Sequence, residues 1–169
     1  MPDRSPHKLS LLFYVAILIG SILLCQAAGA LGALGMKGQE TWNWYNSLAK
    51  PPVTPPGWVF GPVWVTLYII MGVAFWLVVI YGRGKRGFRP AVVFFVAQLI
   101  INAIWSPVFF GMQSIGLALV VIILLLIAIG ATIYTFTGVY RTAAWLMVPY
   151  ALWVAFATVL NFWLWLLNR

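Results

Sequence analysis

The chain has 169 residues, of which 64% are hydrophobic and 7% are charged, and its formal net charge at pH 7 is +8. Soluble domains carry about a quarter charged residues, so this composition predicts a protein whose solvent is lipid. A basic balance is also typical of nucleic-acid-binding proteins, but here the ten Lys and Arg residues are spread among short connectors and form no patch. We therefore expect no nucleic-acid partner and a single membrane domain over residues 1–169.

Five apolar segments are long enough to cross a bilayer, which takes about 20 residues. They are too long and continuous for the alternating strands of a membrane barrel, so helices are expected. The predicted fold is therefore an all-α bundle of five transmembrane helices, in which short links make consecutive helices antiparallel neighbours. The spans cover about residues 9–34, 58–81, 90–110, 115–137 and 143–167.

The connector over residues 36–57 is long and rich in proline and tryptophan. Its end belongs to the stretch KPPVTPPGWVFGPVW, residues 50–64, which runs on into the second span. Each proline fixes φ and removes a backbone donor, so this connector is not an ordinary flexible link. Trp44 and Tyr45 add apolar weight, and polar groups near Lys37 or Lys50 are placed to meet the carboxylates of a ligand. We expect a semi-rigid aromatic lid over the helix ends; a loop that lies in the membrane interface is the alternative.

Basic residues are distributed unequally between the two sides of the predicted bundle. Seven lie on the side of the N-terminus and three on the side of the long connector. The positive-inside rule therefore places the N-terminus in the cytoplasm. The seven are Arg4, Lys8, Arg83, Lys85, Arg86, Arg89 and Arg141, and the three are Lys37, Lys50 and Arg169.

Acid–base and metal chemistry have few residues to use. The acids are Asp3 and Glu40, the single histidine is His7, and none of them lies in a predicted span. No carboxylate pair, metal-ligand cluster or Ser-His-Asp set can be assembled from these residues. We therefore expect no ion-driven pump, no conventional hydrolase, no metal site and no cofactor, and we assign no firm catalytic residue.

Tryptophan is the most over-represented residue type, with ten copies. Tryptophan favours the headgroup level of a membrane, which accounts for Trp145 and Trp163 near the ends of the last span. Trp64, Trp105 and Trp153 fit this explanation less well, because each lies several residues inside a predicted span and close to a proline. They are candidates for a binding site, with an interfacial belt or core packing as the alternatives.

Two amides lie within the predicted spans, where an unbonded amide costs free energy. Asn102 and Asn161 either join helices by hydrogen bonds or contact a ligand directly. Asn102 and Trp105 are three residues apart and share a helix face. Trp153, Ala157 and Asn161 are spaced by four and share another, on which Ala157 leaves a recess beside the indole.

Three blocks of this sequence resemble the translocator protein family, whose members are also called tryptophan-rich sensory proteins and peripheral-type benzodiazepine receptors. The blocks are WYNSLAKPPVTPPGWVFGPVWVTLYIIMG, NAIWSPVFFG and PYALWVAFATVLNFWLW, and they extend from about Trp44 to Trp165. The resemblance implies a five-helix bundle, often a homodimer, that binds porphyrins such as protoporphyrin IX, sterols and benzodiazepine-site ligands. A membrane receptor or sensor is therefore expected, and a transporter of porphyrin or sterol is the alternative.

Carried over by motif, the resemblance also implies which residues form the site. Two family tryptophans implicated in light-dependent porphyrin breakdown match Trp64 and Trp153, so a light- and oxygen-dependent porphyrin-degrading enzyme is a further alternative. Phe162 stands where animal members have the tyrosine of a proposed cholesterol motif, which favours a prokaryotic cell membrane over a mitochondrial outer membrane. The implied pocket residues are Trp64, Asn102, Trp105, Trp153 and Ala157, and the implied lid residues are Trp44, Tyr45, Lys50 and Pro51.

Overall fold

The computed structural model describes residues 11–36 and 38–169, and these residues form helices joined by turns and short connectors. Five helical segments are long and apolar enough to cross a membrane, as the sequence predicts. Their ends differ from the predicted ones by at most two residues where both can be compared; residues 9 and 10, where the first span was expected to start, lie outside the described residues. The spans are α1 (Leu11–Ala33), α3 (Gly57–Gly82), α4 with η1 (Phe88–Ser106 and Pro107–Gly111), α5 (Ile115–Val139), and α6 with α7 (Arg141–Leu146 and Val148–Leu167).

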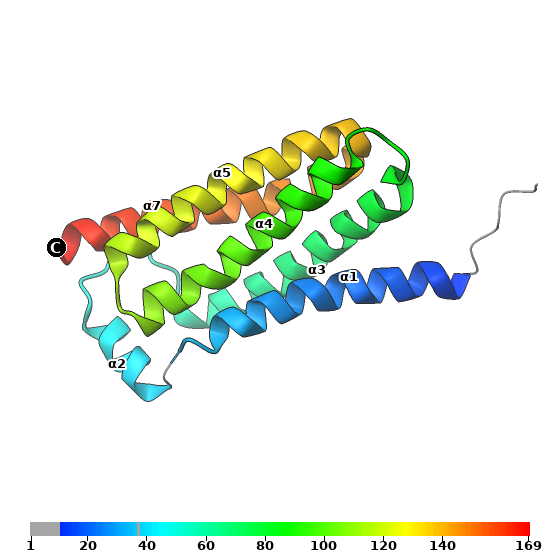
Figure 1. Ribbon diagram of the computed structural model, residues 1–169. Helices are drawn as coiled ribbons and strands as arrows, with labels where there is room; N and C mark the ends of the chain where they lie inside the picture. The colour runs from blue at the N-terminus through cyan, green and yellow to red at the C-terminus, as the bar shows by residue number, and fades with distance from the viewer. Residues whose placement is uncertain (1–10, 37) are drawn as a thin grey trace, which may run out of the picture.

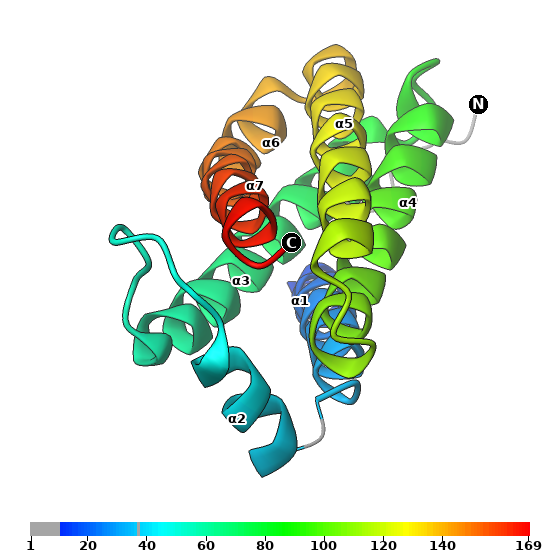
Figure 2. The same cartoon turned by 90° about the vertical axis from the view of Figure 1, so that its left-hand side faces the viewer.

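The spanning helices lie side by side in one bundle (Figure 1). The C-terminus and the start of α3 lie at one end, and the turn between α3 and α4 lies at the other (Figures 1 and 2). The centre of the bundle is apolar: Phe95 of α4 is fully buried and stacks on Phe75 of α3, with ring centroids 4.3 Å apart. Phe136 of α5 also stacks on the Phe95 ring, with ring centroids 5.9 Å apart. These rings join three spans through one packed layer.

Glycine allows α1 and α3 to approach closely. A Cβ placed on Gly72 of α3 would lie 2.6 Å from the Ile22 Cα atom of α1. The obstructing atom belongs to a helix backbone, which cannot rotate away, so only glycine fits at this contact. Small residues at such crossings are typical of membrane helices, because packing rather than water exclusion holds them together.

Two of the spans are interrupted near a proline. The π-helical turn η1 (Pro107–Gly111) follows α4, and the Met112 N–H donates to the Pro107 carbonyl at 2.9 Å. In the last span, Met147 separates α6 from α7, two residues before Pro149. Proline has no N–H and its ring crowds the preceding turn, so the helical hydrogen-bond pattern changes around it. The sequence indicated continuous spans here, and the structure divides them.

The connector between α1 and α3 has helical structure that the sequence analysis does not predict. It contains a nine-residue helix, α2 (Gln39–Ser47), at the end of the bundle that carries the C-terminus (Figures 1 and 2). After α2, the Ala49 N–H donates to Asn168 Oδ1 and Asn168 Nδ2 donates to the Ala49 carbonyl, both at 2.9 Å. This pair of hydrogen bonds joins the connector to the residue just beyond α7, 119 positions away.

Candidate functional site

Aromatic rings from α3 and α7 alternate along the line where these two helices meet. Phe60 of α3 meets Trp153 of α7 edge-on, with ring centroids 5.9 Å apart. One turn along α3, Trp64 meets Tyr150 of α7 edge-on at 6.3 Å and stacks on Tyr68 of its own helix at 5.5 Å. The backbones of α3 and α7 make few close approaches, so these rings carry much of the contact between the two helices.

A chain of polar side chains lies beside these rings and joins α3, α4 and α7. The Tyr68 hydroxyl donates to Asn102 Oδ1 at 2.6 Å, and Asn102 Nδ2 donates to the Tyr150 hydroxyl at 3.0 Å. The Tyr150 hydroxyl in turn donates to Gln98 Oε1 at 3.1 Å. All four side chains are buried. Buried polar groups need such partners, so the chain stabilises one arrangement of the three helices.

The second amide joins α7 to two further segments. The Trp105 indole N–H of α4 donates to Asn161 Oδ1 of α7 at 3.3 Å, and Asn161 Nδ2 donates to the Ile115 carbonyl at the start of α5 at 3.0 Å. Asn161 shares a helix face with Ala157 and Trp153, which precede it at four-residue spacing. The sequence left two roles open for Asn102 and Asn161, and the structure shows both of them in hydrogen bonds between helices.

The connector contacts this end of the bundle through α2. The rings of Trp44 and Tyr45 meet Phe109 of η1 edge-on, with centroids 5.6 and 6.4 Å away. Trp105 stacks on the same Phe109 ring at 5.2 Å, so one phenylalanine links the connector to a predicted pocket residue. Lys50 Nζ lies 4.7 Å above the Tyr45 ring. These contacts fix the position of α2, but its action as a lid stays a prediction.

The electrostatic character of this region is close to neutral. Burial raises the pKa of the Tyr45 hydroxyl above its ordinary value, so Tyr45 is neutral and keeps its proton at physiological pH. Lys50 supplies a positive charge at the edge, where its Nζ also donates to the Asn46 carbonyl at 3.3 Å. Among residues 11–36 and 38–169, no group of three or more His, Cys, Asp or Glu side chains is placed to hold a metal ion. Aromatic rings, hydrogen-bonding groups and the positive charge of Lys50 are what this region presents to a ligand.

The nine predicted site residues fall into two connected sets. Trp64, Asn102 and Trp153 belong to the region where α3, α4 and α7 meet, and Ala157 packs against the same core. Trp44, Tyr45 and Trp105 meet at Phe109, with Lys50 above Tyr45 and Pro51 buried in the turn that follows. Sequence reasoning missed the residues that connect the predicted ones. These are Phe60, Tyr68, Gln98, Phe109 and Tyr150; four-residue spacing from Trp64 would have found Phe60 and Tyr68.

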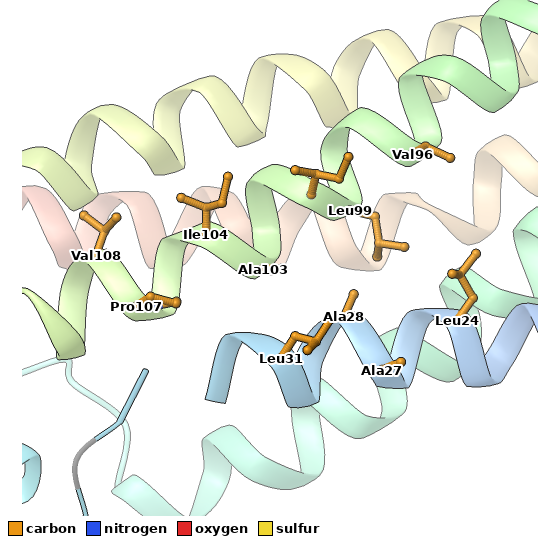
Figure 3. A pocket seen from close by; sticks show the side chains of 11 residues that line it. Leu24, Ala27, Ala28, Leu31, Val96, Leu99, Ala103, Ile104, Pro107 and Val108 are labelled. Atoms are coloured by element: carbon orange, nitrogen blue, oxygen red, sulfur yellow. The ribbon is translucent and has the colours of Figure 1, made fainter. Parts of the chain in front are cut away.

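A separate apolar groove of about 490 Å³ lies between α1 and α4 and is open to the surroundings (Figure 3). None of the nine predicted residues lines it. Its walls are short aliphatic side chains rather than indoles, so it is a different surface from the aromatic region on α7. The lining residues are Leu24, Ala27, Ala28, Leu31, Val96, Leu99, Ile100, Ala103, Ile104, Pro107 and Val108.

The fold and this region define an integral membrane protein with five spanning helices, of which α3, α4 and α7 bring aromatic and amide side chains together. The sequence model of the TspO/MBR family matches residues 21–166, and the chain belongs to this family. It is 43% identical over 148 residues to "Tryptophan-rich protein TspO" of Chlorobaculum tepidum, a match that covers 88% of this chain and 91% of the relative.

Two further relatives come from different branches of life. The chain is 38% identical over 147 residues to "Tryptophan-rich sensory protein" of Cereibacter sphaeroides, covering 87% of this chain and 88% of the relative. It is 38% identical over 153 residues to "Translocator protein" of Bos taurus, covering 89% of each chain. The predicted membership in the translocator and tryptophan-rich sensory protein family is thus confirmed.

Proposed function

We propose that the protein is a membrane receptor or sensor that binds a porphyrin of the protoporphyrin IX type against the aromatic face of α7. The observation that carries this proposal is the Trp153 indole N–H, which is buried and has no hydrogen-bond partner in the described part of the chain. A buried donor without a partner costs free energy, so a ligand that brings an acceptor would be favoured there.

The surroundings of Trp153 support a flat, largely apolar ligand. The rings of Phe60 and Phe156 lie beside Trp153, and Trp64 lies one turn beyond Phe60 on α3. Ala157, one turn further along α7, has a small side chain that leaves space beside the indole. Aromatic rings bind flat ligands by stacking or edge contact, and a hydrogen bond from an indole N–H would orient the bound ligand. Sterols and benzodiazepine-site ligands share the apolar part of this chemistry and belong to the same proposal.

The test is a titration of the purified protein in detergent with protoporphyrin IX in the dark, read by quenching of tryptophan fluorescence. Trp64→Ala and Trp153→Ala should each weaken binding by about 1–3 kcal/mol, the range measured when an aromatic platform for nucleobases is removed. A loss of about 1.4 kcal/mol of binding free energy corresponds to a roughly tenfold higher Kd. Trp145→Ala is the matched control, because this side chain on α6 is 70% exposed. Unchanged affinity in the Trp64→Ala/Trp153→Ala double variant would exclude the assigned site.

A conservative variant separates the ring of Trp153 from its N–H. Trp153→Phe keeps an aromatic ring and loses the donor, so it should bind more weakly than the wild type and more tightly than Trp153→Ala.

The same titration under light distinguishes the degradation alternative. Loss of porphyrin absorbance beyond one equivalent of protein, abolished in Trp64→Ala and Trp153→Ala, would favour an enzyme over a receptor. Transport would instead appear as porphyrin flux into proteoliposomes above that of empty liposomes.

The proposal extends to the orientation of the chain in a prokaryotic cell membrane. Five of the described basic residues lie at one end of the bundle. They are Arg83, Lys85 and Arg86 between α3 and α4, Arg89 in the first turn of α4, and Arg141 at the start of α6. Lys50 and Arg169 lie at the other end, while Arg4, Lys8 and Lys37 lie outside the described residues. This asymmetry supports a cytoplasmic N-terminus. Alkaline phosphatase fused after Arg169 should then be active, and an inactive fusion would reverse the orientation.

Self-association as a homodimer is the last part of the proposal. In support of it, α1 buries a smaller share of its residues than the other four spanning helices do. The small residues Ala27, Ala28 and Ala103 in the groove between α1 and α4 allow another helix to approach closely (Figure 3). Ala27→Trp should shift the mass measured by light scattering in detergent from two chains to one. A monomeric wild type would refute this part.

A further inference from the structure

A second groove lies between α3 and α4 at the end of the bundle remote from α2. Its volume is about 430 Å³, and its inner walls are aromatic and aliphatic side chains of both helices. Arg83, which follows α3, and Arg89, in the first turn of α4, also line it. The remaining lining residues are Phe75, Val79, Phe88, Val92 and Val93. This groove is distinct from the aromatic region on α7 and shares no residue with it.

The two arginines have no acidic partner in the described part of the chain. Glu40 is the one acidic residue among residues 11–36 and 38–169, and it lies in α2, at the opposite end of the bundle (Figure 1). The neighbouring Lys85 is already engaged, because its Nζ donates to the Val139 carbonyl at the end of α5 at 2.7 Å. Arg83 and Arg89 therefore keep their charges free for an anion from outside the chain.

We propose that this groove binds one anionic phospholipid, with its phosphate on Arg83 and Arg89 and an acyl chain along the apolar wall. Guanidinium groups bind phosphate through paired N–H donors, which makes arginine better suited to this contact than a diffuse positive charge. Val79 lies one turn before Arg83, and Val93 lies one turn after Arg89, so the apolar wall extends from the arginines into the membrane. Basic pockets between helices at a membrane surface are suited to anionic headgroups.

The apolar wall decides between a lipid and a free anion as the ligand. Val93 is 63% exposed although it belongs to a spanning helix, so the groove is open sideways to the acyl chains of the bilayer. A soluble phosphate would use the arginines and leave this wall uncovered. A phospholipid fits both parts of the groove at once, because its phosphate can bind the arginines while its attached acyl chain covers the apolar wall.

The experiment uses the full chain, stripped of lipid in detergent and titrated with dioleoyl phosphatidylglycerol or dioleoyl phosphatidylcholine, with bound lipids counted by native mass spectrometry. The wild type should bind one phosphatidylglycerol at least about tenfold more tightly than phosphatidylcholine. Arg83→Gln/Arg89→Gln should lose this preference. Arg141→Gln is the matched control, since it removes an exposed arginine at the same end of the bundle, at the start of α6, without touching the groove.

Two further measurements complete the design. Val93→Trp, which fills the groove and keeps both arginines, should weaken phosphatidylglycerol binding, and a large excess of inorganic phosphate should not displace the lipid. The proposal is overturned if the wild type shows no preference between the lipids, or if Arg141→Gln loses the preference to the same extent as the double variant. Displacement by inorganic phosphate, with Val93→Trp binding as the wild type does, would also overturn it, because the site would then bind a free anion.

Discussion

Replacing Asn102 by leucine is expected to lower the free energy of unfolding by about 1–3 kcal/mol. The substitution removes two hydrogen bonds between helices, one from the Tyr68 hydroxyl at 2.6 Å and one to the Tyr150 hydroxyl at 3.0 Å. Bonds of this kind between membrane helices average about 0.6 kcal/mol and reach about 1.7, so two of them come to about 1–3 kcal/mol. Leucine has nearly the shape of asparagine, so the contribution from an added cavity is small.

A double-mutant cycle isolates one of these bonds. Tyr68→Phe removes only the donor to Asn102 and should cost about 0.6–1.7 kcal/mol. The double variant should cost less than the sum of the two single variants by about the same amount, because both remove the shared bond. Thr158→Val is the matched control: its Oγ1 donates to the Val154 carbonyl of its own helix at 2.8 Å, so no contact between helices is lost.

The assay is unfolding of the purified protein in mixed micelles by sodium dodecyl sulfate, followed by circular dichroism and tryptophan fluorescence. The order of stability should be wild type and Thr158→Val, then Tyr68→Phe, then Asn102→Leu. If Asn102→Leu unfolds at the same detergent fraction as Thr158→Val, the polar chain does not stabilise the bundle. Additive effects of Tyr68→Phe and Asn102→Leu would show that the 2.6 Å contact contributes nothing in the membrane protein.

Two other substitutions test the packing of the bundle and of its connector. Gly72→Ala places a Cβ 2.6 Å from the Ile22 Cα atom and should destabilise the protein by about 1–3 kcal/mol in the same unfolding assay. A Cβ on Gly130 would meet no atom of another helix within 4 Å, so Gly130→Ala should be neutral or slightly stabilising. Equal effects of the two would refute the close contact between α1 and α3. Asn168→Ala removes both hydrogen bonds to Ala49, so amide exchange over residues 39–56 should accelerate while that of the spanning helices stays unchanged. Unchanged exchange in the connector would mean that the contacts of α2 with η1 are enough to hold it.

Much of the architecture could be predicted because a bilayer leaves a chain few choices. A run of about 20 apolar residues must satisfy its own backbone groups, and a helix is the way to do so. That argument gave the number of spans and placed their ends within two residues where the structure permits comparison. The composition also limited the acid–base and metal chemistry that the protein can perform, since the sequence has two acidic residues and one histidine. The family followed from sequence blocks alone.

The candidate site depended more on the tertiary structure. Sequence spacing placed Asn102 with Trp105 and Asn161 with Ala157, but spacing within one helix says nothing of the partner helix. Only the folded bundle shows that Asn102 lies between two tyrosine hydroxyls and that Asn161 receives the Trp105 N–H. The role of Phe109, which joins the connector to Trp105, has no signal in the sequence because it depends on the π-helical turn at η1.

The connector shows the same division. By itself, the sequence determined that the connector is rich in aromatic residues and that φ is restricted at its four prolines, since proline restricts φ wherever it occurs. It also determined that the protein lies in a membrane, because hydrophobicity is a property of composition. Only the tertiary structure decided that part of the connector forms a helix. It also decided that Ala49 pairs with Asn168, which lies 119 positions away. The reason is physical: local preferences act within a few residues, whereas these contacts exist only after the helix ends have been brought together.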